Sequence, residues 1–311
     1  MLYRYCCWLL LFALSAQCVG AEKPLYQCTE AEVGAFLAEL HSSEPDLRKR
    51  VVRIARRNLG QPYELYLLGE APFETYDPQP LYCLGKSDCV VFAEHTYAMA
   101  LADSWPRFMA LLQRIRYRDG QIGVLTRNHY TEADWNISNR WLVTDITSEV
   151  AGDAAMKFSQ PIDRAAFFRN RYKIEAKIPV QKWDDIYLPM DELARADAAL
   201  QPGDFVNVVR GVVLDPTKPP AGAFVGHVGL IGRAEDGTLT MIHSSEPKVR
   251  EEPLAAYIAR MKTDHAERDA ARKPRLVGFK FLRLNADPLG ELEKLDGPGA
   301  PKVTVPNGGK L

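Results

Sequence analysis

Apolar residues recur at helical intervals near the start of the chain and predict two amphipathic helices. Thr29 and Glu32 have the spacing of a capping box, so the first helix is expected over residues 30–41. The second begins at about residues 44–46 and ends before Gly60, which favours a left-handed helix end. Its apolar stripe consists of Leu47, Val51, Ile54 and Leu59.

A third helix is expected over residues 88–102, with the sequence DCVVFAEHTYAMALA. It follows a loop over residues 61–87 that contains several prolines and glycines. Asp88 stands at the capping position and Cys89 falls in the first turn. Glu94 is expected on the helix surface. The sequence therefore places a cysteine at the start of a helix.

Beyond residue 200 the pattern changes to short β-rich runs, whereas residues 251–270 have a helical pattern. Residues 105–200, which contain several aromatic side chains, form a mixed region between the two parts. The expected strands cover residues 204–209, 228–232, 238–243 and 276–283. Helices first and antiparallel strands later predict an α+β fold.

The first residues differ from the rest and predict a secretory signal peptide, residues 1–21. Arg4 precedes an apolar run, and Val19 and Ala21 are small residues where a signal peptidase cleaves. The run is too short for a permanent membrane span, which takes about 20 apolar residues. A lipoprotein anchor at Cys18 is the alternative, but the bulky Gln17 before it disfavours that reading. A secreted protein without stable membrane insertion is expected.

The remaining chain is interpreted as one folded domain over residues 22–284, with a large insert at about 105–200. Residues 285–311 are rich in proline and glycine and predict a flexible tail. Hydrophobic residues make up 47% of the chain and charged residues 25%, as in folded soluble proteins. The net charge of −1 gives no indication of a nucleic-acid partner. Basic residues clustered over 48–57 are interpreted as a solvated helix face.

Removal of the signal would leave three cysteines, Cys28, Cys83 and Cys89. An odd number in an oxidising compartment favours a disulfide between Cys28 and Cys83, with Cys89 kept as a thiol. The alternative is three reduced cysteines that pack as small hydrophobic residues. Cys89 is the candidate nucleophile, because unpaired N–H groups and the helix dipole favour its thiolate and lower its pKa below about 8.5.

A thiol nucleophile needs a base and a group that orients the base, and His227 and His243 fit these requirements. They lie on two expected strands joined by a three-residue loop that ends in Gly237, which suits the left-handed position of such a loop. This register places His243 opposite Gly229, so both imidazoles project from one face of the sheet. Gly229 leaves space for the second ring.

Five motifs in order along the chain resemble the NlpC-type superfamily of papain-like cell-wall cysteine peptidases. They are LGQPY (59–63), DCVVF (88–92), LQPGDF (200–205), HVGLI (227–231) and MIHSS (241–245). The resemblance implies a papain-like fold, with a nucleophile helix packed on an antiparallel sheet. It also implies that Cys89 is the nucleophile, His227 the base and His243 the orienting residue, and that Tyr63 lines the substrate cleft.

Departures from the typical pattern point to one branch of this superfamily. The large insert, the segment DCVVFAE and the run RNHY (127–130) resemble the N-acetylmuramoyl-L-alanine amidase-like group, formerly a domain of unknown function. That branch cuts the amide between muramic acid and the stem peptide, whereas typical members cut between D-glutamate and the diamino acid. The resemblance implies a periplasmic enzyme with a peptidoglycan or muropeptide substrate and no cofactor.

Five residues of the insert are candidates for substrate binding: Arg127, Asn128, His129, Tyr130 and Trp135. Arg127 has the geometry to hold a carboxylate bidentately, and His129 or Trp135 would frame the sugar. The alternative is a hydrogen-bonded loop that stabilises the insert.

Three other functions remain open from the sequence. A γ-D-glutamyl-diamino acid endopeptidase would use the same three catalytic residues. A zinc hydrolase would use His129, His227 and His243, although no usual zinc-binding spacing is present. A non-catalytic cell-wall-binding module would keep the fold but would have no need of a free thiol.

Overall fold

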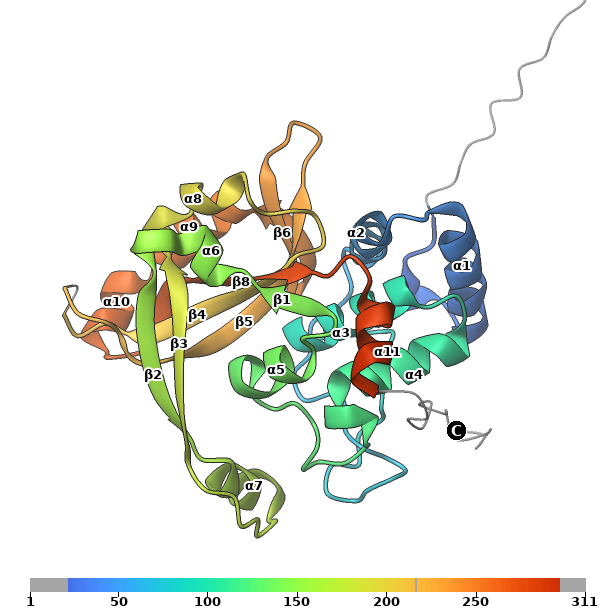
Figure 1. Ribbon diagram of the computed structural model, residues 1–311, viewed down its shortest axis with the longest axis horizontal. Helices are drawn as coiled ribbons and strands as arrows, with labels where there is room; N and C mark the ends of the chain where they lie inside the picture. The colour runs from blue at the N-terminus through green and yellow to red at the C-terminus, as the bar shows by residue number, and fades with distance from the viewer. Residues whose placement is uncertain (1–21, 216, 297–311) are drawn as a thin grey trace, which may run out of the picture.

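The computed structural model describes residues 22–215 and 217–296. The expected signal peptide, with Cys18, and residues 297–311 lie outside the described part. Within it, helices of the first half pack against one face of an antiparallel sheet built from the second half (Figure 1). The α+β prediction is confirmed.

The helices in chain order are α1 (Glu30–Ser43), α2 (Leu47–Arg57), α3 (Cys89–Leu101), α4 (Trp105–Arg116), α5 (Asn136–Ser138), α6 (Thr147–Ala151), α7 (Arg164–Tyr172), α8 (Ala194–Asp197), α9 (Leu254–Lys262), α10 (His265–Ala270) and α11 (Pro288–Asp296). The strands are β1 (Val143–Asp145), β2 (Met156–Ile162), β3 (Gln181–Pro189), β4 (Phe205–Val212), β5 (Ala221–Arg233), β6 (Leu239–Ser245), β7 (Lys248–Pro253) and β8 (Arg275–Leu284).

The first two helices begin where the sequence predicts. The Thr29 hydroxyl accepts from the Glu32 N–H, and the Glu32 carboxylate accepts from the Thr29 N–H, which completes the capping box of α1. The Asp46 carboxylate caps α2 by accepting the N–H of Arg48 at 2.9 Å. Gly60 follows α2 with a φ of +90°, a conformation that glycine adopts without strain.

Helix α3 is the centre of the helical half. Almost its whole surface is buried from Val91 to Leu101, which is typical of a helix enclosed on all sides. Its apolar side chains contact α1, α2 and α4 as well as β5 and β6. This packing fixes the start of α3, and with it Cys89, against the sheet.

The sheet has the strand order β2-β3-β8-β4-β5-β6-β7, with β1 paired to β8, and every pair is antiparallel. All four expected strands are present. Strands β1, β2, β3 and β7 were not predicted, and β2 and β3 form a long hairpin that carries α7 (Figure 1). The expected helix over residues 251–270 is wrong at its start, because residues 251–253 pair with β6 as part of β7.

Two apolar cores lie on opposite faces of the sheet. The first core joins α1–α4 to one face and includes Phe92, Val228 and Ile242. The second core lies between the other face and helices α6, α8 and α9, and includes Met241 and Tyr257. No helix among residues 22–215 and 217–296 is long and apolar enough to cross a bilayer.

The prediction of a flexible tail from residue 285 is wrong for its first part. Residues 288–296 form helix α11, whose Leu289 and Leu292 pack against the first core. Arg114 also donates to Asp296 at 3.3 Å. These apolar and polar contacts hold the segment on the helical half.

The predicted disulfide between Cys28 and Cys83 is also wrong, because both residues are free thiols. Cys28 packs against the first core and its thiol donates to the Pro24 carbonyl at 3.4 Å. Cys83 instead packs against a separate small cluster formed by Leu67, Leu68 and Val91. Each cysteine acts as a small apolar residue in its own cluster.

Candidate active site

Cys89 is the first residue of α3 and is half-buried. The Asp88 carboxylate caps the helix by accepting the Val91 N–H at 2.8 Å. The Cys89 N–H therefore belongs to the first helical turn, whose N–H groups have no acceptors within the helix.

The start of α3 is attached to the strand that carries His243. The Ser244 hydroxyl donates to the Ser87 carbonyl at 2.8 Å, and the two hydroxyl oxygens lie 3.0 Å apart. The Ser87 hydroxyl also donates to the Gln61 side chain at 2.7 Å. Both serines are buried, so this contact is protected from water. It keeps Cys89 in register with β6.

The hairpin of β5 and β6 has the predicted register. The Ala234 N–H donates to the Thr238 carbonyl at 2.9 Å, and Gly237 between them has a φ of +85°. The ladder continues to the pair Leu230–Ile242, which aligns residue 243 with residue 229. A Cβ at Gly229 would lie 2.7 Å from the Met241 Cγ and 3.1 Å from the His243 Cβ, so glycine leaves space for both side chains.

The two histidines form a direct hydrogen bond, with 2.7 Å between His227 Nε2 and His243 Nδ1. Their rings are nearly perpendicular, at 81°. His243 is fully buried, and its Nε2 lies 2.9 Å from a carboxylate oxygen of Glu252 on β7. The Tyr257 ring lies parallel to the His227 ring, with 6.3 Å between centroids.

The electrostatics differ from the expected thiolate. Burial, followed by the charge of Asp88, raises the pKa of Cys89 to about 12. Burial, followed by the charge of His243, lowers the pKa of His227 well below its ordinary value, and burial also lowers the pKa of His243. Hydrogen bonds from backbone N–H groups lower the pKa of Cys89, but they do not offset the increase that burial of the thiol causes. The thiol of Cys89 and the imidazoles of His227 and His243 are therefore neutral at rest.

The sulfur of Cys89 interacts with the N–H of Val228, the residue after His227. Among the described residues, no hydrogen bond joins this sulfur to either imidazole. His227 uses Nε2 for its bond to His243, so Nδ1 is the ring nitrogen without a hydrogen-bond partner among those residues. Catalytic hydrogen bonds are often long before substrate binds. Tyr63 is half-buried near the sulfur, where burial and then the charge of Cys89 raise the pKa of its phenol to about 12. Its role in the cleft stays a prediction.

Arg127 and Asn128 do not have side chains free for substrate. The Arg127 guanidinium pairs with Asp77 at 2.9 Å and Glu70 at 3.3 Å and donates to the Leu68 carbonyl at 2.9 Å. The Asn128 amide donates to a backbone carbonyl and accepts from a serine hydroxyl. Both side chains support the insert, which corrects the prediction of substrate binding.

His129 and Trp135 are likewise structural. His129 Nε2 lies 2.7 Å from the Val124 carbonyl, and its ring packs against two phenylalanines of α7. Trp135 is 1% exposed and donates to Glu94 at 3.0 Å, so its ring cannot contact a sugar. Glu94 is itself buried, not on the helix surface as expected. Tyr130 is half-buried under Arg164, and substrate binding by it stays a prediction.

The zinc alternative required His129 beside His227 and His243. No group of three histidine, cysteine, aspartate or glutamate residues within 22–215 and 217–296 is arranged to hold a metal ion. His129 contacts the aromatic side chains of α7 instead of the two strand histidines.

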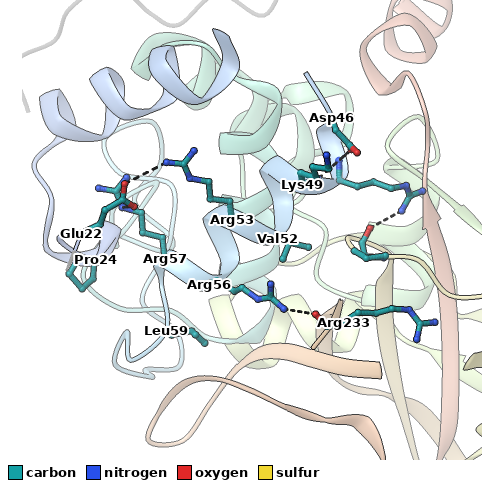
Figure 2. A pocket seen from close by; sticks show the side chains of 12 residues that line it. Glu22, Pro24, Asp46, Lys49, Val52, Arg53, Arg56, Arg57, Leu59 and Arg233 are labelled. Atoms are coloured by element: carbon teal, nitrogen blue, oxygen red, sulfur yellow. Dashed lines mark hydrogen bonds and ion pairs between the residues drawn. The ribbon is translucent and has the colours of Figure 1, made fainter. Parts of the chain in front are cut away.

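A groove of about 800 Å³ lies beside α2. Its lining includes Lys49, Arg53, Arg56 and Arg57 of the basic cluster (Figure 2). Its arginines pair with carboxylates of the same chain, for example Arg48 with Asp204 at 2.8 Å and Arg56 with Glu251 at 2.9 Å. Lys49, Arg53 and Arg56 are exposed, as expected for a solvated helix face, whereas the prediction is wrong for Arg50, which is buried and donates to the Ala100 carbonyl at 2.8 Å. None of Cys89, His227 and His243 lines the groove.

Three site residues were missed from the sequence: Glu252, Tyr257 and Arg260. Arg260 on α9 donates to Glu252 at 2.6 Å and lies over the Tyr257 ring. Because a helix was expected over residues 251–270, the pairing of β7 with β6 was not predicted. This pairing brings Glu252 to His243. The available signal was Glu252 itself, an acidic residue in the short segment that follows MIHSS and a possible hydrogen-bond acceptor for His243.

Comparisons with known proteins identify similar families and folds. A family model described as AmiA-like, N-acetylmuramoyl-L-alanine amidase-like, matches residues 53–264. The matched segment includes Cys89, His227, His243 and Glu252. A search of the curated proteins found no match.

Several solved structures have a similar fold. A Legionella pneumophila protein aligns with a TM-score of 0.69 and 19% identity, over 82% of this chain and 94% of its own. An N-acetylmuramoyl-L-alanine amidase of Bacteroides uniformis aligns with a TM-score of 0.57 and 24% identity, over 77% and 99%. A provisionally named xylanase of Bacteroides fragilis aligns with a TM-score of 0.54 and 23% identity, over 74% and 99%. At these identities the likeness shows the fold alone.

Proposed function

The chain belongs to the AmiA-like, N-acetylmuramoyl-L-alanine amidase-like family, and we propose that it is a thiol-dependent N-acetylmuramoyl-L-alanine amidase that acts on muropeptides. Cys89 is the nucleophile, His227 the base and His243 the residue that orients the base. The family supports hydrolysis of peptidoglycan amides, whereas the thiol mechanism and the choice of bond are our inference.

One observation carries the proposal. The hydrogen-bonded pair of His227 and His243 lies on the same strands that hold the start of α3, through Ser244 and Ser87. A thiol, a base and an orienting group are the parts that nucleophilic amide hydrolysis needs. Burial lowers the pKa of His227 and keeps its ring neutral, so one ring nitrogen is unprotonated at neutral pH.

In the first half of the reaction, Cys89 Sγ attacks the carbonyl carbon of the amide between the lactyl group of muramic acid and L-alanine. The thiol proton passes to His227 Nδ1 as the sulfur–carbon bond forms. The oxyanion lies near the Cys89 N–H at the helix start, which stabilises its charge. The C–N bond then breaks, His227 protonates the leaving amine, and a thioester remains on Cys89.

In the second half, His227 removes a proton from water, which attacks the thioester. The products are the carboxylic acid of muramic acid and the Cys89 thiol, with the stem peptide already released. No step requires a metal ion or an organic cofactor. Because the high pKa of Cys89 disfavours a resting thiolate, proton transfer and attack occur together.

The order of the five sequence motifs supports a papain-like, NlpC-type classification of the fold. The basic, apolar and small-residue pattern of residues 1–21 supports secretion, and a peptidoglycan substrate is consistent with a periplasmic location.

Purified muropeptides test the proposal, with product masses as the measurement. We expect the wild-type chain to release the intact stem peptide, and Cys89→Ala to release none while it remains folded. A product that keeps L-alanine and D-glutamate on the sugar would identify an endopeptidase. Binding without turnover by the wild-type chain would identify a wall-binding module. Unchanged turnover in Cys89→Ala would refute the thiol mechanism.

A further inference from the structure

We propose that Glu252 is a positioning residue that sets the tautomers of both histidines and so directs the lone pair of His227 Nδ1 towards the nucleophile. This inference rests on the proposed roles of Cys89 and His227. It extends the expected set of three residues to four.

The contacts form a continuous line across three neighbouring strands. A Glu252 carboxylate oxygen on β7 lies 2.9 Å from His243 Nε2 on β6. His243 Nδ1 lies 2.7 Å from His227 Nε2 on β5. The alignment follows from the sheet, because β5, β6 and β7 are consecutive and antiparallel.

The chemistry of each group fixes where the protons are. A carboxylate only accepts hydrogen bonds, so His243 must carry its proton on Nε2 and donate to Glu252. The His243 Nδ1 is then an acceptor, and His227 must donate to it from Nε2. A neutral imidazole carries one ring proton, which leaves His227 Nδ1 as a lone pair. This nitrogen is the base that the proposed reaction uses.

Glu252 is held in the ionised form that this arrangement requires. Burial opposes its ionisation, but hydrogen bonds from His243 and Arg260 outweigh burial and lower its pKa to about 2. Arg260 donates to the same carboxylate oxygen at 2.6 Å and so fixes the orientation of the carboxylate.

The other charged and titratable groups around the histidines come from β4, β7 and α9. Arg210, Arg250 and Arg260 lower the pKa of His227 through their positive charge, after burial and His243. The Tyr257 hydroxyl is buried and has no hydrogen-bond partner among the described residues. Glu252 is the carboxylate that contacts His243 in this cluster.

A purely structural role for Glu252 is the competing explanation. A fully buried histidine is costly when its ring nitrogens lack partners, so Glu252 would stabilise the fold whether or not it affects catalysis. The experiment therefore needs readouts that stability alone does not change: the tautomers of the two rings and the separation of kcat from KM.

The test variants are Glu252→Leu, Glu252→Gln and the control Glu251→Gln, each in the full chain. Glu251 is the neighbour of Glu252 on β7 but bonds to Arg56 at 2.9 Å and to Thr240 at 2.6 Å, not to a histidine. The control removes the same charge from the same strand. Urea unfolding of each variant establishes that it is folded at the assay temperature.

The tautomers are read from imidazole ¹⁵N shifts in the Cys89→Ala background, assigned by single histidine substitutions. With Glu252 present, we expect Nε2 of both rings to be of the protonated type and Nδ1 to be of the lone-pair type. Glu252→Leu should give mixed tautomers at His243 and His227. Glu252→Gln, whose amide oxygen still accepts, should preserve them in part. Glu251→Gln should leave them unchanged.

Turnover of muropeptides gives the second readout. We expect Glu252→Leu to lower kcat at least about tenfold with KM nearly unchanged, because wrong tautomers impair only the proton-transfer steps. Glu252→Gln should recover part of this loss, and Glu251→Gln should match the wild type. Unchanged tautomers in Glu252→Leu, or a kcat within about twofold of wild type, would overturn the inference.

The two proposals fail in different ways. The tautomer measurement needs no turnover, so it tests Glu252 even if the protein cuts another bond. Activity that persists in Cys89→Ala would refute the proposed function, whatever the tautomers are.

Discussion

Ser244 donates a buried hydrogen bond of 2.8 Å to the carbonyl of Ser87, although the two residues are 157 positions apart. Ser244 follows His243 and Ser87 lies two residues before Cys89. The contact therefore joins the segment of the nucleophile to the strand of the histidines. Together with the packing of α3 against β5 and β6, it holds the segment of the nucleophile against the strands of the histidines.

Ser244→Ala should lower kcat more than its effect on stability would suggest. Loss of the hydroxyl removes this hydrogen bond, but the Ser87 carbonyl still accepts from the Glu64 N–H at 3.2 Å. The expected cost is therefore about 0.5–1.5 kcal/mol in unfolding free energy. A sulfur displaced by about 1 Å can reduce turnover about 100-fold. Steady-state kinetics and urea unfolding measure both effects.

Ser245→Ala is the matched control, because Ser245 lies next to Ser244 and its hydroxyl makes no hydrogen bond within residues 22–215 and 217–296, whereas its carbonyl accepts from Arg250. It should retain wild-type kcat. A Ser244→Ala variant with the same kcat as Ser245→Ala would show that this contact does not position the nucleophile.

Cys89 should rest as a half-buried neutral thiol and not as a thiolate. Since its pKa is raised to about 12, the alkylation rate with iodoacetamide should increase with pH and reach no plateau below about pH 9. Subtraction of the rate for Cys89→Ala removes the contributions of Cys28 and Cys83. A plateau with a midpoint below neutral pH would instead indicate a thiolate–imidazolium pair.

Arg210→Gln should shift the acid limb of the pH profile to higher pH. The charge of Arg210 lowers the pKa of His227, after burial and His243. Without that charge the pKa rises, so His227 becomes protonated and inactive as a base at a higher pH. The measurement is kcat/KM against pH, which reports the free enzyme.

Arg210→Lys keeps the positive charge and should leave this acid limb near its wild-type position. A shift of equal size in both variants would mean that packing, not charge, sets the pKa of His227. Arg210 packs against Gly226, so packing is the relevant alternative.

Glu94→Ala should destabilise the domain by about 3–5 kcal/mol, because it leaves a buried charge without a main partner. Glu94 is 2% exposed, pairs with Arg116 at 3.3 Å and accepts from Trp135 at 3.0 Å. Urea unfolding measures the loss. Glu175→Ala, which removes an exposed carboxylate, should change the unfolding free energy by less than about 0.5 kcal/mol. Equal losses in the two variants would contradict this role of Glu94.

Local patterns in the sequence predicted the parts of the site that depend on neighbouring residues. The cap of α3 at Asp88 depends on residues three positions apart, and the hairpin register depends on the three-residue loop that ends in Gly237. Both were predicted because such signals lie within one turn or one loop. The same reasoning failed for β7, because the short charged segment KVREEP (248–253) has no helical or strand signal strong enough to decide.

The sequence alone determined that a cysteine begins a helix and that two histidines share one face of a hairpin. Only the tertiary structure decided that Cys28 and Cys83 are free thiols in separate clusters. It also decided that the side chains of Arg127 and His129 make structural contacts, and that Glu252 completes the line of hydrogen bonds through His243 to His227. These outcomes depend on contacts between distant segments and on burial. Burial also reversed the expected shift of the Cys89 pKa, since desolvation outweighed the helix N–H groups at a position whose burial the sequence does not reveal.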